Sequence, residues 1–495
     1  MENVVAGFGL ILDPQVLLVI FVSALFGLFV GAVPGLTATM ATALLVPITF
    51  FMDPVPSISA IVACTAMAIC AGDIPGALLR IPGTPASAAY TDEAYAMTRR
   101  GQAEQALGAG LVCAAIGGLI GALVLVVAAP FLARIALRFS SFEYFWLAAL
   151  GLTSSALVSS DERVRGAVSL LIGLFISTVG LDVTGGFPRF TFDVVELTGG
   201  VSFIPAMIGM FALSEILRNL SGERPPATLP DHKIGNPLAG IPRLLIRHYR
   251  NVLRGSTIGT IIGALPGAGG DMAAWVAYAT AKRFSKTPEK FGTGHVEGII
   301  EAGSANNSGL SSAWVPALVF GIPGDAVTAI AIGVLYMKGM NPGPTVFLQR
   351  PDMLYAVFIC FFLANLLIIP FGYVAIKLAR RILGVPRNIL MPVILLFCVV
   401  GSFAINNTVF GIGVMLLLGL VAYVMECNRL PIAPVILGIV MGRLLESSFM
   451  TSMIIADGNL LGFFERPIAA GLGAFAILIW TSPLWMRLVR RNKTS

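Results

Sequence analysis

Long apolar stretches run along almost the whole chain, and they decide what it can fold into. Several reach 18 or more residues without alternating apolar and polar positions, which favours membrane-spanning helices over the strands of a barrel. Only 12% of the 495 residues are charged, about half the share found in soluble domains. We therefore expect an all-α polytopic membrane protein with about a dozen transmembrane helices. The apolar segments lie near residues 16–52, 56–83, 105–137, 142–160, 166–186, 200–219, 255–281, 297–337, 352–380, 385–404, 406–426, 430–450 and 465–487.

The distribution of charge also fits a membrane protein. The net charge is +6, and a dense basic group falls between apolar segments, where such groups set the orientation of the spans. We expect contact with the lipid bilayer and none with nucleic acid. The six cysteines form no CxxC pair, and the three histidines match no metal-ligand spacing. No HExxH, P-loop or nucleophile elbow is present, so we predict no enzyme, no metal and no organic cofactor.

The chain repeats a set of motifs in the same order. The first pair reads GxxxGAxPG in both copies at an offset of 232 residues, from Gly27 to Gly259. Ordered matches of this kind indicate an internal duplication. We expect a first repeat at 1–220, a cytoplasmic linker at 221–254 and a second repeat at 255–495. The matched pairs are GLFVGAVPG (27–35) with GTIIGALPG (259–267), ALLRIPG (77–83) with ALVFGIPG (317–324), and PAMIG (205–209) with PVILG (434–438).

The charges beside the first matched pair predict opposite orientations. Arg250 and Arg254 precede the second-half motif and four Lys or Arg residues follow it, so both of its flanks are expected in the cytoplasm. The first-half motif has only acidic neighbours, Glu2 and Asp13 before it and Asp53 after it. We therefore expect an inverted-topology repeat, which is the usual construction of secondary transporters.

Pro-Gly dipeptides interrupt four of the apolar segments. The segment 255–281 has cytoplasmic flanks at both ends, so we expect it to enter the membrane, turn at Pro266-Gly267 and return. Backbone freed by such a break is tolerated at membrane depth where it lines a cavity. The alternatives are a proline-kinked spanning helix and a GxxxG helix-packing face. The predicted substrate-binding residues are Gly31, Pro34, Gly35, Thr37, Pro82, Gly83, Thr84, Gly263, Pro266, Gly267, Ala268, Gly269, Asn306, Asn307, Pro323 and Gly324.

Charged residues inside apolar segments are costly and usually face a transport pathway. The candidates for an ion or charge site are Asp73, Arg80, Asp271 and Asp325, and Glu301 is a further intramembrane acid. Arg80 is expected either to hold an anionic substrate or to pair with Asp73. Asp325 is expected to bind a cation or to cap the helix that follows it. Residues 92–100, which carry a run of charges, are expected to form a solvated loop.

Several longer motifs together resemble a known family, the large membrane subunit of the tripartite tricarboxylate transporters. The resemblance covers most of the chain and becomes weaker after about residue 350. It implies uptake of small carboxylates across a bacterial inner membrane, a small membrane partner subunit, a periplasmic substrate-binding protein and an ion gradient. The motifs are GAVPGLTATMATALLVPITF (31–50), IPGTPASAAYTDEAYAMTRRGQAEQAL (81–107), GLDVTGGFPRFTF (180–192), IPAMIGMFALSEIL (204–217), IGALPGAGGDMAAWVAYATAKRFSKTPEKFGTG (262–294), ANNSG (305–309) and GIPGD (321–325).

The sequence differs from the family pattern at three places near the predicted site. Residues 70–73 read Cys-Ala-Gly-Asp where the family has Tyr-Gly-Gly-Ser. Gly303 stands where a Glu usually precedes the Asn pair, and Glu301 lies two residues earlier. Asp325 stands where a small residue is usual. These differences leave the particular carboxylate and the choice of sodium or protons open.

These features predict a secondary active transporter subunit for di- or tricarboxylates, driven by a sodium or proton gradient. The site would lie near the middle of the bilayer, and one bundle of the inverted repeat would move against the rest. Two alternatives are a passive anion channel, which would use similar broken helices, and a carboxylate transporter that works without a binding protein. A homodimer is a further open alternative.

Overall fold

The computed structural model describes residues 2–158, 163–221, 235–267, 269–385 and 387–491. Seven helices of this part are long and apolar enough to cross a membrane, and six shorter apolar helices accompany them. The predicted all-α polytopic class is confirmed. The elements are α1 (Glu2–Ile11), α2 (Pro14–Ala32), α3 (Ala38–Thr49), α4 (Pro54–Ala71), α5 (Asp73–Leu79), α6 (Ala88–Arg99), α7 (Ala103–Ala136), α8 (Ser141–Val158), α9 (Arg163–Ser177), β1 (Gly180–Leu181), β2 (Pro188–Arg189), η1 (Val195–Leu197), α10 (Phe203–Met207), η2 (Ile208–Leu213), α11 (Ser214–Ser221), α12 (Ile241–Arg247), α13 (Tyr249–Gly263), α14 (Gly269–Phe284), η3 (Pro288–Lys290), α15 (Val296–Phe320), α16 (Ala326–Met337), α17 (Val346–Gln349), α18 (Pro351–Leu383), α19 (Arg387–Asn406), α20 (Val409–Cys427), α21 (Ala433–Ile455), η4 (Leu460–Phe464) and α22 (Pro467–Arg491).

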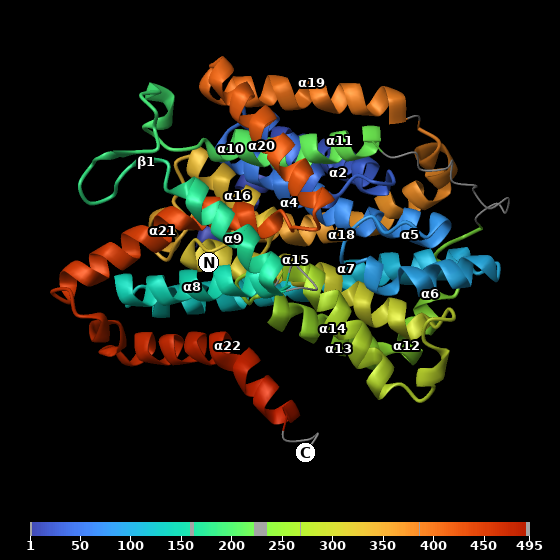
Figure 1. Cartoon of the computed structure of the whole chain (residues 1–495). Helices are drawn as coiled ribbons and strands as arrows, with labels where there is room; N and C mark the ends of the chain where they lie inside the picture. The colour runs from blue at the N-terminus through green and yellow to red at the C-terminus, as the bar shows by residue number, and fades with distance from the viewer. Residues whose placement is uncertain (1, 159–162, 222–234, 268, 386, 492–495) are drawn as a thin grey trace.

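The long helices run in roughly one direction, and α15 lies in the middle of them (Figure 1). The hairpin of β1 and β2 lies at one end of the molecule, and α6 and α12 lie at the other end (Figure 1). Every residue of α15 from 298 to 319 is buried, although this stretch is rich in serine, asparagine and glycine. The buried centre of the fold is therefore a small-residue helix, while α19 and α22 lie at the edges (Figure 1).

Glycines of two neighbouring helices bring their backbones against α15. A Cβ added at Gly255, Gly259 or Gly263 of α13 would collide with backbone atoms of Glu301, Ala305 or Gly309. Gly117 and Gly121 of α7 meet the backbone of Ser304 and Ser308 on another face of α15. Close approach of this kind is how membrane helices associate, because lipid supplies no hydrophobic force between them.

The same contact recurs between α2 and α4. A Cβ at Gly27 would collide with the backbone of Cys64, and one at Gly31 would collide with that of Ala68. The GxxxG pattern is thus a helix-packing face in both copies, as one of the alternatives from the sequence proposed. Gly31 and Gly263 contact a neighbouring helix in this structure, and a substrate-binding role for them stays a prediction.

The predicted reversal within 255–281 is confirmed. Helix α13 ends at Gly263, the chain turns, and α14 begins at Gly269. The guanidinium of Arg254, near the start of α13, lies over the ring of Phe284, the last residue of α14, at 5.1 Å. The two arms therefore begin and end together, as a helical hairpin that packs on α15. The left-handed conformation of Gly267, with φ of 78°, provides the turn.

The two Ile-Pro-Gly breaks have the same backbone geometry. Arg80 and Gly321, which precede them, are both left-handed helix caps, with φ of 58° and 68°. In each case the isoleucine N–H donates to a proline carbonyl six residues back at 3.3 Å, from Ile81 to Pro75 and from Ile322 to Pro316. Each bond is one residue wider than the 6→1 bond of a Schellman motif, and the two breaks share this feature. These bonds align the two breaks residue by residue at an offset of 241, from Pro75 to Pro316.

Glu301 ties the hairpin to the central helix. Its side chain is fully buried, and Arg254 Nε donates to Oε1 at 2.6 Å. Asn251 Nδ2 donates to Oε2 at 2.9 Å. Both carboxyl oxygens of Glu301 are therefore engaged by α13, so this acid supports the fold and does not face a pathway.

The prediction of a solvated loop at 92–100 is wrong. Residues 88–99 form α6, and the side chain of Glu93 is fully buried. Its carboxyl oxygens accept hydrogen bonds from the N–H groups of Gly292, Gly294 and His295 and from Tyr278 Oη. The partners lie about 200 positions away along the chain, so a run of charges in the sequence could not reveal them. Glu93 fixes the connection between α14 and α15 to α6.

We expect Gly259→Leu to destabilise the fold by about 1–3 kcal/mol, because the side chain must enter a backbone contact. Thermal unfolding of the purified protein in detergent measures the effect. Gly413→Leu is the matched control, since Gly413 also lies within a helix but has open space beside it. Equal melting temperatures for the two variants would contradict the packing described for α13 and α15.

We expect Glu93→Ala to cost about 3 kcal/mol or more, because it leaves three N–H donors and the Tyr278 hydroxyl without their buried acceptor. Hydrogen exchange at the amides of residues 292–295 should accelerate strongly. Asp92→Ala is the control, because the neighbouring Asp92 is largely exposed and forms an ion pair with the exposed Arg80. If both variants leave these amides equally protected, Glu93 does not hold the connection.

Candidate functional site

The four Pro-Gly breaks converge on one central cavity of about 40 Å³. The residues that follow each break reach it from different parts of the chain. This space suits a few water molecules or an ion, and it is smaller than a tricarboxylate. The cavity is lined by Thr37, Ala38, Thr39, Ile69, Thr84, Pro85, Gly270, Asp271, Asn306, Leu310, Asp325, Ala326 and Val327.

Three helices begin at this cavity. Helix α3 starts after Thr37, whose Oγ1 accepts from Met40 N–H at 3.1 Å. Helix α16 starts after Asp325, whose Oδ1 accepts from Thr328 N–H at 2.8 Å in a capping box. Helix α14 carries Asp271 in its first turn. The positive ends of three helix dipoles therefore face the same space, which favours anions.

The loop after Pro82-Gly83 is held against α14. Asp271 Oδ1 accepts from Ala86 N–H at 3.2 Å, and Trp275 Nε1 donates to the carbonyl of Pro85 at 3.1 Å. Thr84 and Ser87 cap each other, each N–H donating to the other hydroxyl at 3.0 Å. Asp271 is thus both a loop anchor and an exposed group of the cavity.

The predicted site residues divide into those that line the cavity and those that shape it. Thr37, Thr84 and Asn306 line it, together with the charged candidates Asp271 and Asp325. Asn307 does not line it, and both polar atoms of its buried amide lack a hydrogen-bond partner among the described residues. Ala268 lies outside the described residues. The remaining residues form or adjoin the breaks: Pro34, Gly35, Pro82, Gly83, Pro266, Gly267, Gly269, Pro323 and Gly324.

Several of these turn residues have no room for a side chain. A Cβ at Gly83 would contact Gly72, and a Cβ at Gly324 would contact Ala313. In both cases the contacted residue lies 11 positions earlier in the sequence, before the break. A Cβ at Gly267 would collide with α8, where Ser154 Oγ donates to the carbonyl of Pro266. The glycines therefore allow the breaks to fold back closely, and the residues after them contact the cavity.

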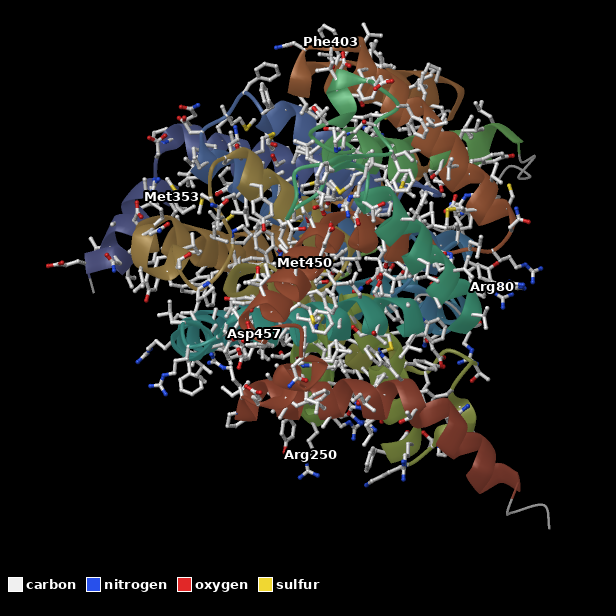
Figure 2. The ribbon with its side chains drawn as sticks, turned by 60° about the vertical axis from the view of Figure 1, so that its left-hand side comes forward. Arg80, Arg250, Met353, Phe403, Met450 and Asp457 are labelled. Atoms are coloured by element: carbon white, nitrogen blue, oxygen red, sulfur yellow. The ribbon has the colours of Figure 1, made fainter. Side chains whose placement is uncertain are left out.

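Arg80 lies away from the cavity. It projects from the edge of the molecule (Figure 2), and its Nε donates to Asp92 Oδ1 at 2.7 Å. This hydrogen bond raises the pKa of the Arg80 guanidinium above its usual value. Both side chains are more than 60% exposed, so the pair contributes little to stability. Arg80 therefore neither pairs with Asp73 nor contributes to the site in this structure.

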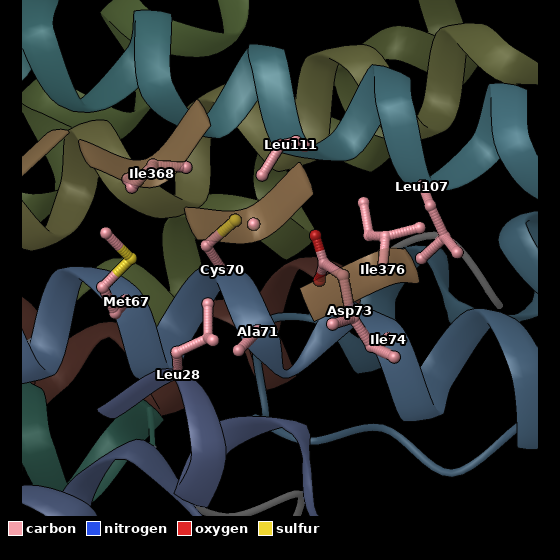
Figure 3. Close-up of a pocket in the computed structure, with 11 residues that line it drawn as sticks. Leu28, Met67, Cys70, Ala71, Asp73, Ile74, Leu107, Leu111, Ile368 and Ile376 are labelled. Atoms are coloured by element: carbon pink, nitrogen blue, oxygen red, sulfur yellow. The ribbon is translucent and has the colours of Figure 1, made fainter. Parts of the chain in front are cut away.

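Asp73 lies in a second, smaller cavity between α4, α7 and α18 (Figure 3). Tyr90 Oη donates to Asp73 Oδ1 at 2.6 Å, and Asn306 Nδ2 donates to Tyr90 Oη at 3.4 Å. Because Asn306 also lines the central cavity, a chain of hydrogen bonds connects the two spaces. Tyr90 was not predicted from the sequence, although it falls within the IPGTPASAAY motif.

A larger cavity of about 700 Å³, which we call the vestibule, opens beside α9, the β1–β2 hairpin, α16 and α21. Arg443 of α21 lines it and forms no hydrogen bond or ion pair with any residue that the structure describes. Arg189 also lines it, and Nη1 of Arg189 lies 2.6 Å from Oε1 of Glu446. Arg443 was not predicted from the sequence, although it is the single arginine inside the apolar segment 430–450.

The vestibule and the central cavity share helix α16. Val327 lines the central cavity, whereas Gly333 and Tyr336 line the vestibule. Six residues of helix span about 9 Å. A carboxylate in the vestibule would therefore be about two helical turns from the central cavity.

The chemistry of the central cavity suits ions. The central cavity combines helix N-termini with two carboxyl groups, an amide and hydroxyl groups. Within the described part of the chain, no three His, Cys, Asp or Glu residues lie together as a metal site would require. The arrangement can hold a carboxylate, a cation or both.

Comparison with known proteins identifies the chain. An uncharacterized 52.8 kDa protein from the TAR-I ttuC' 3' region of Agrobacterium vitis is 34% identical over 480 residues, covering 96% of this chain and 94% of that protein. An uncharacterized protein from the TAR-II ttuC' 3' region of the same organism is 33% identical over 228 residues, covering 46% of this chain and 94% of that protein. No solved structure matches. The model of the tripartite tricarboxylate transporter TctA family matches residues 17–437, so the chain is a multi-pass membrane protein that belongs to this family.

Proposed function

We propose that the chain is the permease of a secondary active system that takes up small di- or tricarboxylates across a bacterial inner membrane. It would work with a small membrane subunit and a periplasmic substrate-binding protein, use the gradient of a cation, and catalyse no chemical reaction. The observation that carries the proposal is the convergence of four helix breaks on one cavity in a chain of the TctA family. Broken helices around a central site are typical of secondary transporters.

The charges at the central cavity support coupling to a cation. Three helix N-termini favour an anion there, but Asp271 and Asp325 already place two acids beside them. A carboxylate substrate entering this space would be repelled unless positive charge arrived with it. A cation or a proton that binds together with the substrate removes this repulsion, and the same linkage couples the two movements.

An inverted repeat with alternating access fits the arrangement of elements. In each half a pair of helices is followed by a segment ending at Ile-Pro-Gly, then by a helix of 12 residues, α6 or α16, and later by a helix of 34 or 33 residues with an internal proline, α7 or α18. Phe50, after the first hairpin, lines the vestibule beside the β1–β2 hairpin. The second hairpin ends at Phe284, and Gly294 in the connection that follows packs against Met97 of α6 at the opposite end of the molecule (Figure 1). Hairpins that open at opposite ends support the proposal.

We further propose that the vestibule receives the substrate. Its volume of about 700 Å³ accommodates a tricarboxylate. The guanidinium of Arg443 matches a carboxylate geometrically and has no partner among the described residues. Substrate held there would then move along α16 to the central cavity when the surrounding helices rearrange.

A passive anion channel is the second candidate, because broken helices and an arginine also suit a pore. The difference is thermodynamic, since a channel cannot accumulate substrate above equilibrium. The chain and its two partner subunits, reconstituted in liposomes, should concentrate labelled citrate or succinate when a proton or sodium gradient is imposed. Equilibration without accumulation under both gradients would favour the channel. Equal uptake without the binding protein would favour a system that does not need one.

We expect Asn306→Ala to reduce uptake by about tenfold or more, because it removes an amide from the central cavity. Asn307→Ala is the matched comparison. It is adjacent and equally buried, but its amide bonds to none of the described residues, so its loss should have a much smaller effect. Uptake of labelled citrate in the reconstituted system measures both. Equal losses would contradict the assignment of the cavity.

We expect Arg443→Gln to raise the citrate concentration for half-maximal uptake by about tenfold, with Arg443→Lys intermediate, because a bidentate charge contact is lost. Arg250→Gln is the control, since Arg250 lies at the surface of the molecule (Figure 2) and does not line the vestibule. An unchanged half-maximal concentration in Arg443→Gln would remove Arg443 from the route.

A further inference from the structure

We infer that Asp73 is the proton-binding site that couples transport to a pH gradient, and that Tyr90 and Asn306 link it to the central cavity. The inference rests on the proposed function and adds the identity of the coupling ion.

The geometry connects the two cavities through only two hydrogen bonds. Tyr90 Oη lies 2.6 Å from Asp73 Oδ1 and 3.4 Å from Asn306 Nδ2. Tyr90 is 2% exposed and Asn306 is 3% exposed, so neither side chain exchanges its partner with bulk water. Asn306 belongs to the fully buried part of α15 and lines the space where the substrate is proposed to bind. A change in the protonation of Asp73 therefore alters the hydrogen bonds of Tyr90 and of Asn306, which lines that space.

The surroundings of Asp73 exclude a metal cation and suit a proton. The cavity measures about 10 Å³, enough for about one water molecule. No Lys, Arg or His is among the described residues that line it, and Asp73 is the only one of them with a side-chain oxygen. A sodium or divalent ion would need several oxygen ligands there. The lining residues are Leu28, Met67, Cys70, Ala71, Asp73, Ile74, Leu107, Leu111, Ile368, Gly372 and Ile376, most of them labelled in Figure 3.

Among the described residues, the titratable groups that face Asp73 are Cys70 near the end of α4 and Tyr90 on α6. Helix α7 approaches with Gly110, where a Cβ would lie 3.1 Å from Asp73 Oδ2, and α18 approaches with Ile368, Gly372 and Ile376. Burial without a cation favours the neutral acid, whereas the Tyr90 O–H favours the carboxylate. Because these two effects oppose each other, Asp73 can exchange a proton during a cycle.

Protonation of Asp73 would reorient Tyr90. The carboxylate accepts the Tyr90 O–H, but the neutral acid can donate its own proton to Tyr90 Oη. The Tyr90 hydroxyl is then free to donate toward the central cavity, or to Asn306 Oδ1 once that amide rotates. The proton comes from external water, forms the O–H bond of neutral Asp73 and leaves to water on the other side, so the cycle leaves the protein chemically unchanged. An added proton also removes one negative charge near a site for carboxylates, and substrate and proton therefore favour each other's binding.

Asp73→Asn tests the inference in liposomes that contain the chain with its two partner subunits. With labelled citrate or succinate, accumulation driven by an imposed pH gradient should fall by about tenfold or more, and its dependence on pH should flatten. Exchange of internal for external substrate, which needs no net proton movement, should persist. Proton entry during uptake, followed with a trapped pH indicator, should also be lost. Asp92→Asn, a change of an exposed acid on α6, should leave all of these unchanged.

Tyr90→Phe provides an independent second variant. It removes the donor that stabilises the carboxylate, so the pH dependence of uptake should shift to higher pH and exchange should persist. Accumulation by Asp73→Asn equal to that of the wild type would overturn the inference. Loss of exchange together with accumulation would also overturn it, because Asp73 would then act in folding or substrate binding. A wild-type complex that transports no carboxylate would instead remove the proposed function.

Discussion

The contact of glycine-bearing helices with the backbone of α15 is the constraint on which the rest of the structure depends. Gly259 of α13 and Gly117 of α7 each meet backbone atoms of α15, on two different faces. Lipid surrounds a membrane protein with a solvent as apolar as leucine, so helices are held by dispersion at close range and by polar contacts. Only residues without bulky side chains bring backbones to this distance, and this explains why α15 itself is built from glycine, alanine and serine.

A small-residue helix at the centre also explains how polar groups are tolerated there. The serines of α15 bond to carbonyls of their own helix or of the helix that touches it, such as Ser311 Oγ with Gly118 O at 3.1 Å. They need no larger partner, so they do not hold the neighbouring helices apart. The amide side chains of Asn306 and Asn307 are too large to be accommodated between closely packed helices in the way that the serines are. One amide reaches Tyr90 and the central cavity, and the other bonds to none of the described residues.

The sequence predicted the parts of the site that local backbone chemistry determines. Proline and glycine change the backbone conformation at their own positions. The four breaks and the reversal after Gly263 could therefore be predicted from the local sequence. Contacts between side chains that lie far apart in the sequence could not be predicted in this way. Arg80 looked like an intramembrane charge because it follows an apolar run, but as a left-handed cap it is turned out to the surface. Glu93 looked solvated because the N–H donors that pair with its buried carboxylate lie in a loop near residue 292.

The acids of the site occupy different environments, and this separates their roles. Asp271 and Asp325 lie where helices begin, so N–H groups and helix dipoles stabilise their charged forms in an open cavity. Asp73 lies among apolar side chains with one hydroxyl donor. The two kinds of site therefore offer different partners, backbone N–H groups in the first and a single hydroxyl in the second. In the proposed mechanism, the pair at the helix ends attracts a hydrated cation or repels a bare carboxylate, whereas Asp73 takes up the proton. Because Tyr90 and Asn306 join these environments, the occupancy of one changes the energy of the other, which is the physical requirement for coupled transport.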